Sequence, residues 1–170
     1  VIPSILPRHP FSAALAQAKD AEPNGYQVYM SDSDGALISE RATLESDLRP
    51  ALAEDELEIL FQPQVEISSD RLIGVEALVR WRHPGLGLIQ AEKLLSAAGR
   101  AEISAQLGHH IIDKALAEAQ AWPPALADLR LSVNVTAADL AADRFEESLI
   151  EQIGASGFSA SRLTVEVTEG

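Results

Sequence analysis

Residues 74–81 read GVEALVRW, an apolar run that is interrupted by two charged side chains, Glu76 and Arg80. Successive side chains of a β-strand point to opposite faces, so these two residues share one face of a strand. A charged group inside an apolar strand is costly to bury unless something binds it. We therefore expect a strand over residues 71–81 with one apolar face and one functional polar face.

The same pattern recurs in two strands that are predicted further along the chain. Asn134 lies in the predicted strand of residues 129–135, and Glu166 lies in that of residues 163–168. In both strands leucine and valine occupy the opposite face. The apolar faces would pack on helices, and the polar faces would meet in a barrel interior or in a cleft near the strand ends.

Before residue 71 the pattern predicts a helix and one more strand. The helix would run from Ser39 to about Asp55, with a kink or a break near Arg49, because a proline in mid-helix, here Pro50, costs about 3 kcal/mol. The strand would cover residues 58–67 and would carry Gln62.

Helical spacing fills the gaps between the later strands. Apolar stripes at this spacing run through residues 107–119 and 140–153, and Gly154 would cap the second helix. From residue 71 onward the order is strand, helix, strand, helix, strand. This alternation favours an α/β fold with a parallel sheet and right-handed crossovers, as in a (β/α)8 barrel with functional groups at the strand ends.

The polar residues of these strands suggest a site for a hard cation. Glu76, Asn134 and Glu166 offer two carboxylates and one amide oxygen, which suit Mg²⁺ or Mn²⁺. Such an ion lowers the pKa of a bound water and clamps the oxygens of a phosphodiester. Arg80, on the same face as Glu76, suits a phosphate through a forked pair of hydrogen bonds. The alternative is that each group is hydrogen-bonded locally at a strand end, and the pattern alone leaves both interpretations open.

Composition limits the partners and the location of the protein. The chain has 170 residues, a formal net charge of −13, 46% hydrophobic residues and no cysteine. A DNA or RNA polymer is excluded as a partner, because phosphate neutralisation needs a basic surface. Disulfides and cysteine-based zinc sites are excluded as well. No apolar run reaches the length of a membrane span. We expect a cytoplasmic protein, unless a segment outside this chain tethers it to a membrane.

Five short motifs, in this order, resemble the first half of an EAL domain. They are FQP at 61–63, EALVRW at 76–81, HPG at 83–85, VNVT at 133–136 and EVTE at 166–169. The resemblance extends over about residues 40–170. It implies a partial (β/α)8 TIM-like barrel with an antiparallel first strand. The family hydrolyses the bacterial second messenger cyclic di-GMP to linear pGpG.

The resemblance also implies roles for the polar residues. Glu76, Asn134 and Glu166 would be the catalytic ligands of Mg²⁺ or Mn²⁺, and Gln62 and Arg80 would contact cyclic di-GMP. The further glutamate of the EVTE motif, Glu169, would brace a catalytic loop. The family's paired aspartates, lysine, later glutamate and glutamine would lie beyond Gly170. A homodimer through the EAL domain is implied too. The alternative is a degenerate EAL module that binds cyclic di-GMP, or a protein, without hydrolysis.

The chain is expected to contain parts of two domains. Residues 1–34, with a helix over 11–19 and a strand over 26–30, resemble the end of a GGDEF domain. The GGDEF motif itself is absent. A polar linker is expected over Ser31–Gly35, because this stretch is turn-like. Residues 35–170 would be the N-terminal half of the EAL domain.

Overall fold

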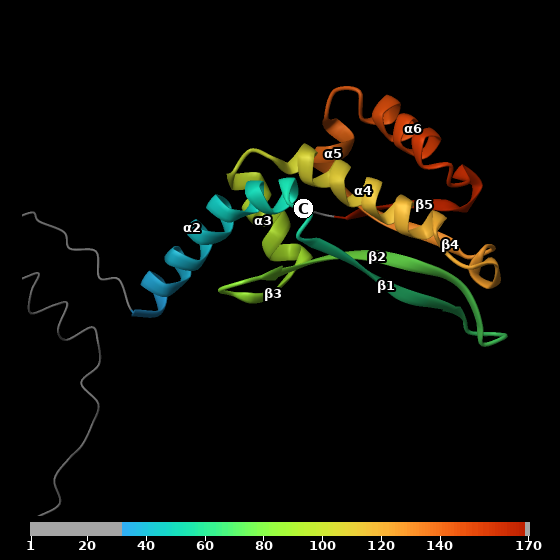
Figure 1. Ribbon diagram of the computed structural model, residues 1–170, viewed down its shortest axis with the longest axis horizontal. Helices are drawn as coiled ribbons and strands as arrows, with labels where there is room; N and C mark the ends of the chain where they lie inside the picture. The colour runs from blue at the N-terminus through green and yellow to red at the C-terminus, as the bar shows by residue number, and fades with distance from the viewer. Residues whose placement is uncertain (1–31, 169–170) are drawn as a thin grey trace, which may run out of the picture. The chain divides into compact units, whose positions relative to one another are not determined.

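The computed structural model describes residues 32–168 (Figure 1). The helix and the strand expected in residues 11–30 lie outside this range, and so does Glu169. The helices are α2 (Asp32–Ala53), α3 (Ala91–Arg100), α4 (Ser104–Gln120), α5 (Ala137–Ala141) and α6 (Phe145–Ser156). The strands are β1 (Leu57–Glu66), β2 (Arg71–His83), β3 (Gly87–Gln90), β4 (Arg130–Thr136) and β5 (Leu163–Thr168). The described residues from Glu40 onward form one compact unit.

The strands form one mixed sheet in the order β1-β2-β4-β5, with β3 on the side of β2. β1 pairs antiparallel with β2, whereas β2 with β4 and β4 with β5 are parallel. This confirms the α/β fold with an antiparallel first strand and a parallel continuation. The sheet does not close on itself within the described residues, so the fold is that of a partial barrel.

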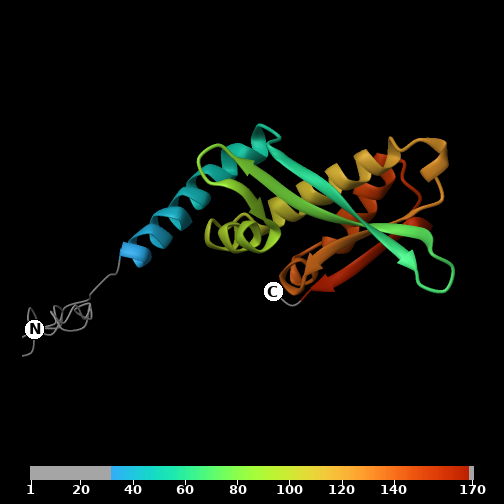
Figure 2. The same cartoon turned by 90° about the horizontal axis from the view of Figure 1, so that it is seen from below.

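One face of the sheet is covered by helices, with α4 lying behind the long β1–β2 hairpin (Figure 2). The strand side chains on this face are apolar and buried, as the alternation predicts. The core contains Val75, Ala77, Val79 and Trp81 of β2, Leu131, Val133 and Val135 of β4, and Leu107, Ile112 and Leu116 of α4. Trp81 also donates a hydrogen bond from Nε1 to Oε2 of Glu56, at 3.0 Å. The indole ring of Trp81 is thus buried in the core, and its N–H group still has a hydrogen-bond acceptor.

Of the kink or break expected near Arg49, the break is wrong, since α2 continues through Pro50 to Ala53. Pro50 has no backbone N–H, so the helix loses one internal hydrogen bond at this residue. Burial compensates for this loss, because Leu48 and Ala51 pack in the core on either side of the proline. The backbone N–H of Glu56 then donates to the carbonyl of Ala51 at 2.9 Å and closes the helix end.

The turn-like conformation expected over Ser31–Gly35 is wrong for its described part, because α2 begins at Asp32. Serine and aspartate are common in turns, but the same residue types are favoured in the first turn of a helix. Local composition does not separate the two outcomes here.

The single helix expected over residues 140–153 is in fact two helices, α5 and α6. Gly154 lies inside α6, and the left-handed residue after the helix is Gly157, with φ of 71°. Leu140 and Ile150 are 47% and 68% exposed, so they do not belong to one buried stripe. Two short helices in sequence imitate the apolar spacing of one longer helix, which is why the pattern predicts a single helix here.

No helix within residues 32–168 combines the length and the apolar character that crossing a membrane requires.

Candidate functional site

The polar face of the sheet gathers most of the predicted site residues. Gln62 of β1 lies directly opposite Glu76 of β2. Glu76 lies opposite Ser132 of β4, two residues before Asn134 on the same face. Asn134 in turn lies opposite Glu166 of β5. The register thus places one polar side chain from each of four adjacent strands on one face.

Glu76 and Asn134 are in direct contact. Asn134 Nδ2 donates a hydrogen bond to Glu76 Oε1 at 2.7 Å, and both residues are partly buried. A bond between an amide and an ionised carboxylate is stronger than a neutral one, and it fixes the direction of the amide. With Nδ2 committed to Glu76, Oδ1 of Asn134 remains as the acceptor of this side chain.

Glu166 is held by a residue that the sequence did not single out, Gln64. Its Nε2 lies 3.5 Å from Glu166 Oε1 and 3.4 Å from Oγ of Ser132. Gln64 shares the face of Gln62, two residues earlier. The two-residue spacing from Gln62 is the feature of the sequence that could have identified Gln64. The motif that contains Gln62 ends at Pro63, however, so the resemblance assigns no role to Gln64.

Arg80 is further from this group. It lies four residues beyond Glu76, about 13 Å along an extended strand. Its Nη1 donates to the carbonyl of its neighbour Val79 at 2.7 Å, and within residues 32–168 no carboxylate forms an ion pair with it. The structure therefore brings together Gln62, Glu76, Asn134 and Glu166. Arg80 lies on the same face but further along β2.

The donor set fits a hard divalent cation. Two carboxylates and one amide oxygen come from adjacent strands, and oxygen donors of this kind are what Mg²⁺ prefers. Among the described residues no three His, Cys, Asp or Glu side chains cluster as metal ligands. Water, a bound phosphate or residues outside the described range would have to complete the coordination sphere.

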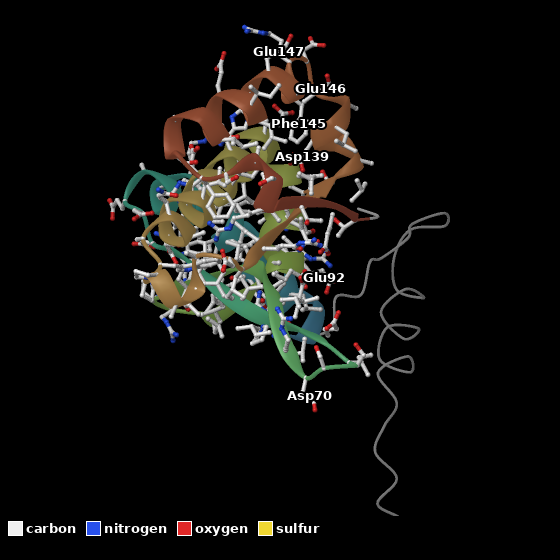
Figure 3. The ribbon with its side chains drawn as sticks, turned by 90° about the vertical axis from the view of Figure 1, so that its right-hand side faces the viewer. Asp70, Glu92, Asp139, Phe145, Glu146 and Glu147 are labelled. Carbon is white, nitrogen blue, oxygen red and sulfur yellow. The ribbon has the colours of Figure 1, made fainter. Side chains whose placement is uncertain are left out.

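A cavity of about 320 Å³ lies among α4, α5 and α6 at the end of β4, and Asn134 is one of the residues that line it. It is lined by His109, Asp139, Phe145 and other residues, and Figure 3 shows Asp139 and Phe145 in this region. Asp139 is already engaged, because its Oδ2 accepts from the backbone N–H of Thr136 at 2.8 Å and from Thr136 Oγ1 at 2.7 Å. These bonds cap α5 and fix the end of β4.

Known proteins resemble the chain in both sequence and structure. The EAL domain family matches residues 45–170. The bifunctional diguanylate cyclase/cyclic di-GMP phosphodiesterase MucR of Pseudomonas aeruginosa is 34% identical over 158 residues, which is 92% of this chain and 23% of that protein. A cyclic di-GMP phosphodiesterase of the same organism is 30% identical over 128 residues, 75% of this chain and 22% of that protein. The chain thus spans about a quarter of these relatives.

Solved structures agree with this assignment. The MucR phosphodiesterase in complex with cyclic di-GMP aligns with a TM-score of 0.68 at 32% identity, over 74% of this chain and 51% of that one. The EAL domain of FimX from Pseudomonas aeruginosa, bound to cyclic di-GMP, aligns with a TM-score of 0.64 at 19% identity, over 73% and 49%, and supports the fold alone. The sequence match, the mixed sheet and the motifs on its polar face lead to one conclusion: this chain belongs to the EAL domain family.

Proposed function

We propose that the protein hydrolyses cyclic di-GMP to linear pGpG with the help of Mg²⁺ or Mn²⁺. The observation that carries this proposal is the 2.7 Å contact between Asn134 and Glu76, with Glu166 opposite Asn134 on the next strand. Three oxygen donors from three adjacent strands then face the same side of the sheet. Two of the relatives, MucR among them, are named as cyclic di-GMP phosphodiesterases, which supports the choice of substrate.

The proposed ligands are Glu76, Asn134 and Glu166. When bound, the cation would supply a water of lowered pKa and would offset the charge of the phosphodiester. Glu76 has one oxygen occupied by Asn134, and the other remains for the ion. The same bond uses Nδ2 of Asn134 and leaves Oδ1 as the acceptor for a second partner. The two side chains therefore orient each other before any ligand arrives, which reduces the reorganisation on binding.

Gln62 and Arg80 are proposed to bind the dinucleotide. Gln62 is exposed and lies beside Glu76, so its amide is accessible to a ligand on this face. Arg80 uses one nitrogen for the carbonyl of Val79, and its remaining N–H groups can hold a phosphate in a forked pair. Glu169 is proposed to brace a catalytic loop.

The remaining assignments are proposals of the same kind. Residues 35–170 would form the N-terminal half of the EAL domain, and residues 1–34 would be the end of a GGDEF-like domain. The whole protein would act in the cytoplasm in bacterial second-messenger signalling, as a homodimer through its EAL domain.

The experiment is a turnover assay on the intact protein with cyclic di-GMP, with and without Mg²⁺ or Mn²⁺. Glu76→Ala should lower kcat by roughly 100-fold or more, since it removes a group that stabilises the transition state. Glu146→Ala is the matched control, because Glu146 is an exposed carboxylate on α6 (Figure 3). Its activity should equal that of the unaltered protein.

Two other outcomes of this assay would contradict the proposal. Tight binding of cyclic di-GMP without pGpG under any metal condition would make the protein a receptor. If the protein neither binds nor hydrolyses cyclic di-GMP, a role as a protein scaffold would be the better interpretation.

A further inference from the structure

We infer that Gln64 is a positioning residue for Glu166, which it holds in the orientation that the metal site needs. This inference rests on the proposed function, because it gives Gln64 a role toward a proposed metal ligand. Gln64 itself does not belong to the ligand set. It acts from β1, while its partner lies on β5 at the other end of the strand order.

The contact spans the sheet. Neighbouring strands lie about 4.8 Å apart, so β1 and β5 are separated by about 14 Å at the level of the backbone. The side chains of Gln64 and Glu166 together cross β2 and β4: Nε2 of Gln64 lies 3.5 Å from Oε1 of Glu166 and 3.4 Å from Oγ of Ser132. The amide group carries two hydrogens, so each acceptor can take one of them. Both distances are long for N–H···O hydrogen bonds, which usually lie at about 2.7–3.2 Å.

Small residues beneath Gln64 make this crossing possible. Gly74 is the direct partner of Gln64 in the β1–β2 register. A Cβ at Gly74 would lie 3.1 Å from Gln64 Oε1 and 3.0 Å from the carbonyl oxygen of Arg130, which is too close for an unstrained side chain. The next strand offers Ser132, whose side chain is short and buried. A larger residue at either position would fill the space that Gln64 uses.

The strand geometry also aims Gln64 across the sheet. The β1–β2 register shifts between Gln64 and Val65, directly after the crossing residue. An irregularity of this kind increases the local twist of a strand and redirects the side chains beside it. Gln64 is partly buried, in contrast to its exposed neighbours Pro63 and Val65.

The chemistry of this contact suits a metal ligand. Hydrogen bonds to a ligating carboxylate fix its rotamer, and their loss typically costs about 10–100-fold in metal affinity or activity. Gln64 engages Oε1 of Glu166 and leaves Oε2 for the ion. A neutral amide orients the carboxylate without cancelling its charge, whereas Lys or Arg in this place would compete with the cation.

The test measures Mn²⁺ affinity of the intact protein by isothermal titration calorimetry, without substrate. Gln64→Met keeps the length of the side chain and removes the donor, and Gln64→Glu keeps its shape and adds a repelling charge. Both should weaken Mn²⁺ binding by about 10–100-fold. The control is Gln90→Met at the exposed end of β3, which should bind Mn²⁺ like the unaltered protein.

A double-mutant cycle separates positioning from a general structural role. In a Glu166→Ala background, Gln64→Met should cause no further loss of Mn²⁺ affinity, because the group that it positions is gone. In turnover, kcat at fixed metal should fall while KM for cyclic di-GMP stays within about 2-fold.

The outcomes separate this inference from the proposed function. Unaltered protein that binds Mn²⁺, together with Gln64→Met and Gln64→Glu proteins that bind it equally well, would overturn the role of Gln64 alone. An equal loss with and without Glu166 would overturn it too. An unaltered protein that binds no Mn²⁺ would overturn the proposed function and this inference with it.

Discussion

The side chain of His83 binds the turn between β2 and β3 through one ring nitrogen and binds α2 through the other. Nδ1 accepts hydrogen bonds from the backbone N–H groups of Gly85 at 3.0 Å and Leu86 at 3.1 Å. Since Nδ1 is an acceptor, Nε2 carries the proton, and it donates to Asp47 Oδ2 at 3.1 Å. His83 therefore connects this turn to α2.

Replacing His83 with Ala should lower the free energy of unfolding by about 2 kcal/mol. The change removes two hydrogen bonds within the turn and one to Asp47, and each typically contributes about 1 kcal/mol or less where water can replace the partner. Urea unfolding followed by circular dichroism measures this loss. Gln90→Ala, at the exposed end of β3, serves as the control and should stay within about 0.5 kcal/mol of the unaltered protein. Equal stability of both variants would show that the turn does not depend on His83.

Asp55 joins the end of α2 to α4, and this gives the stability a pH dependence. Lys114 Nζ donates to Asp55 Oδ1 at 2.6 Å, and this hydrogen bond is the main reason that the pKa of Asp55 falls below its usual value of 3.8. The ionised form is thus favoured in the folded state. Its contribution is complete above the unfolded pKa and disappears as the pH falls through the folded pKa.

Asp55→Asn should therefore be less stable than the unaltered protein at about pH 5, and this difference should shrink toward about pH 3. Thermal unfolding at a series of pH values measures it. Asp70→Asn, in the exposed turn between β1 and β2, is a control with a positive backbone φ like that of Asp55. A difference for Asp55→Asn that stays constant with pH would mean that Lys114 does not favour the ionised carboxylate.

Two glycines, one inside α6 and one directly after it, differ in whether the backbone requires glycine. Gly157 follows the helix with φ of 71°, a conformation that glycine adopts without the strain that a Cβ imposes. Gly154 lies inside the helix, and a Cβ there would meet no atom within 4 Å. Alanine is favoured over glycine in a helix interior by about 1 kcal/mol.

The two substitutions should therefore change stability in opposite directions. Gly157→Ala should destabilise the protein by about 1 kcal/mol, and Gly154→Ala should stabilise it by about 0.5–1 kcal/mol. Chemical unfolding of the pair, each variant serving as the other's control, gives both signs in one experiment. Stabilisation by Gly157→Ala would contradict the assignment of Gly157 as the residue that ends the helix, and would favour Gly154 in that role.

The elements that the sequence predicted well are those with a strong two-residue period. β5 occupies Leu163–Thr168 as expected, and the alternation in β2 and β4 separates the buried face from the polar face correctly. Periodicity could not reveal β3, which has only four residues, Gly87–Gln90, and depends on pairing with β2. It could not reveal the role of Gln64 either, because that contact depends on Gly74 and Ser132, which are remote in sequence.

For the molecule as a whole, the described sheet has an unpaired edge. β5 pairs with β4 on one side and, within residues 32–168, with no strand on the other. Val167 of β5 is 61% exposed, and Leu60 and Leu72, on the hairpin strands β1 and β2, are 43% and 41% exposed. An exposed strand edge with apolar side chains is a template for association between chains. A complete barrel would pair this edge and cover this surface.

Residues 36–170 expressed alone should therefore self-associate and should lack a cooperative, monomeric thermal transition. Sedimentation velocity at several protein concentrations, together with calorimetry, would measure both properties. Val167→Lys should reduce association, because a charge on an edge strand opposes pairing. Ile150→Lys is the matched control, since Ile150 is 68% exposed but lies on α6, away from the strand edge. A monomer with one sharp calorimetric transition would mean that the open sheet is stable by itself, and that it needs no further strands to complete its fold.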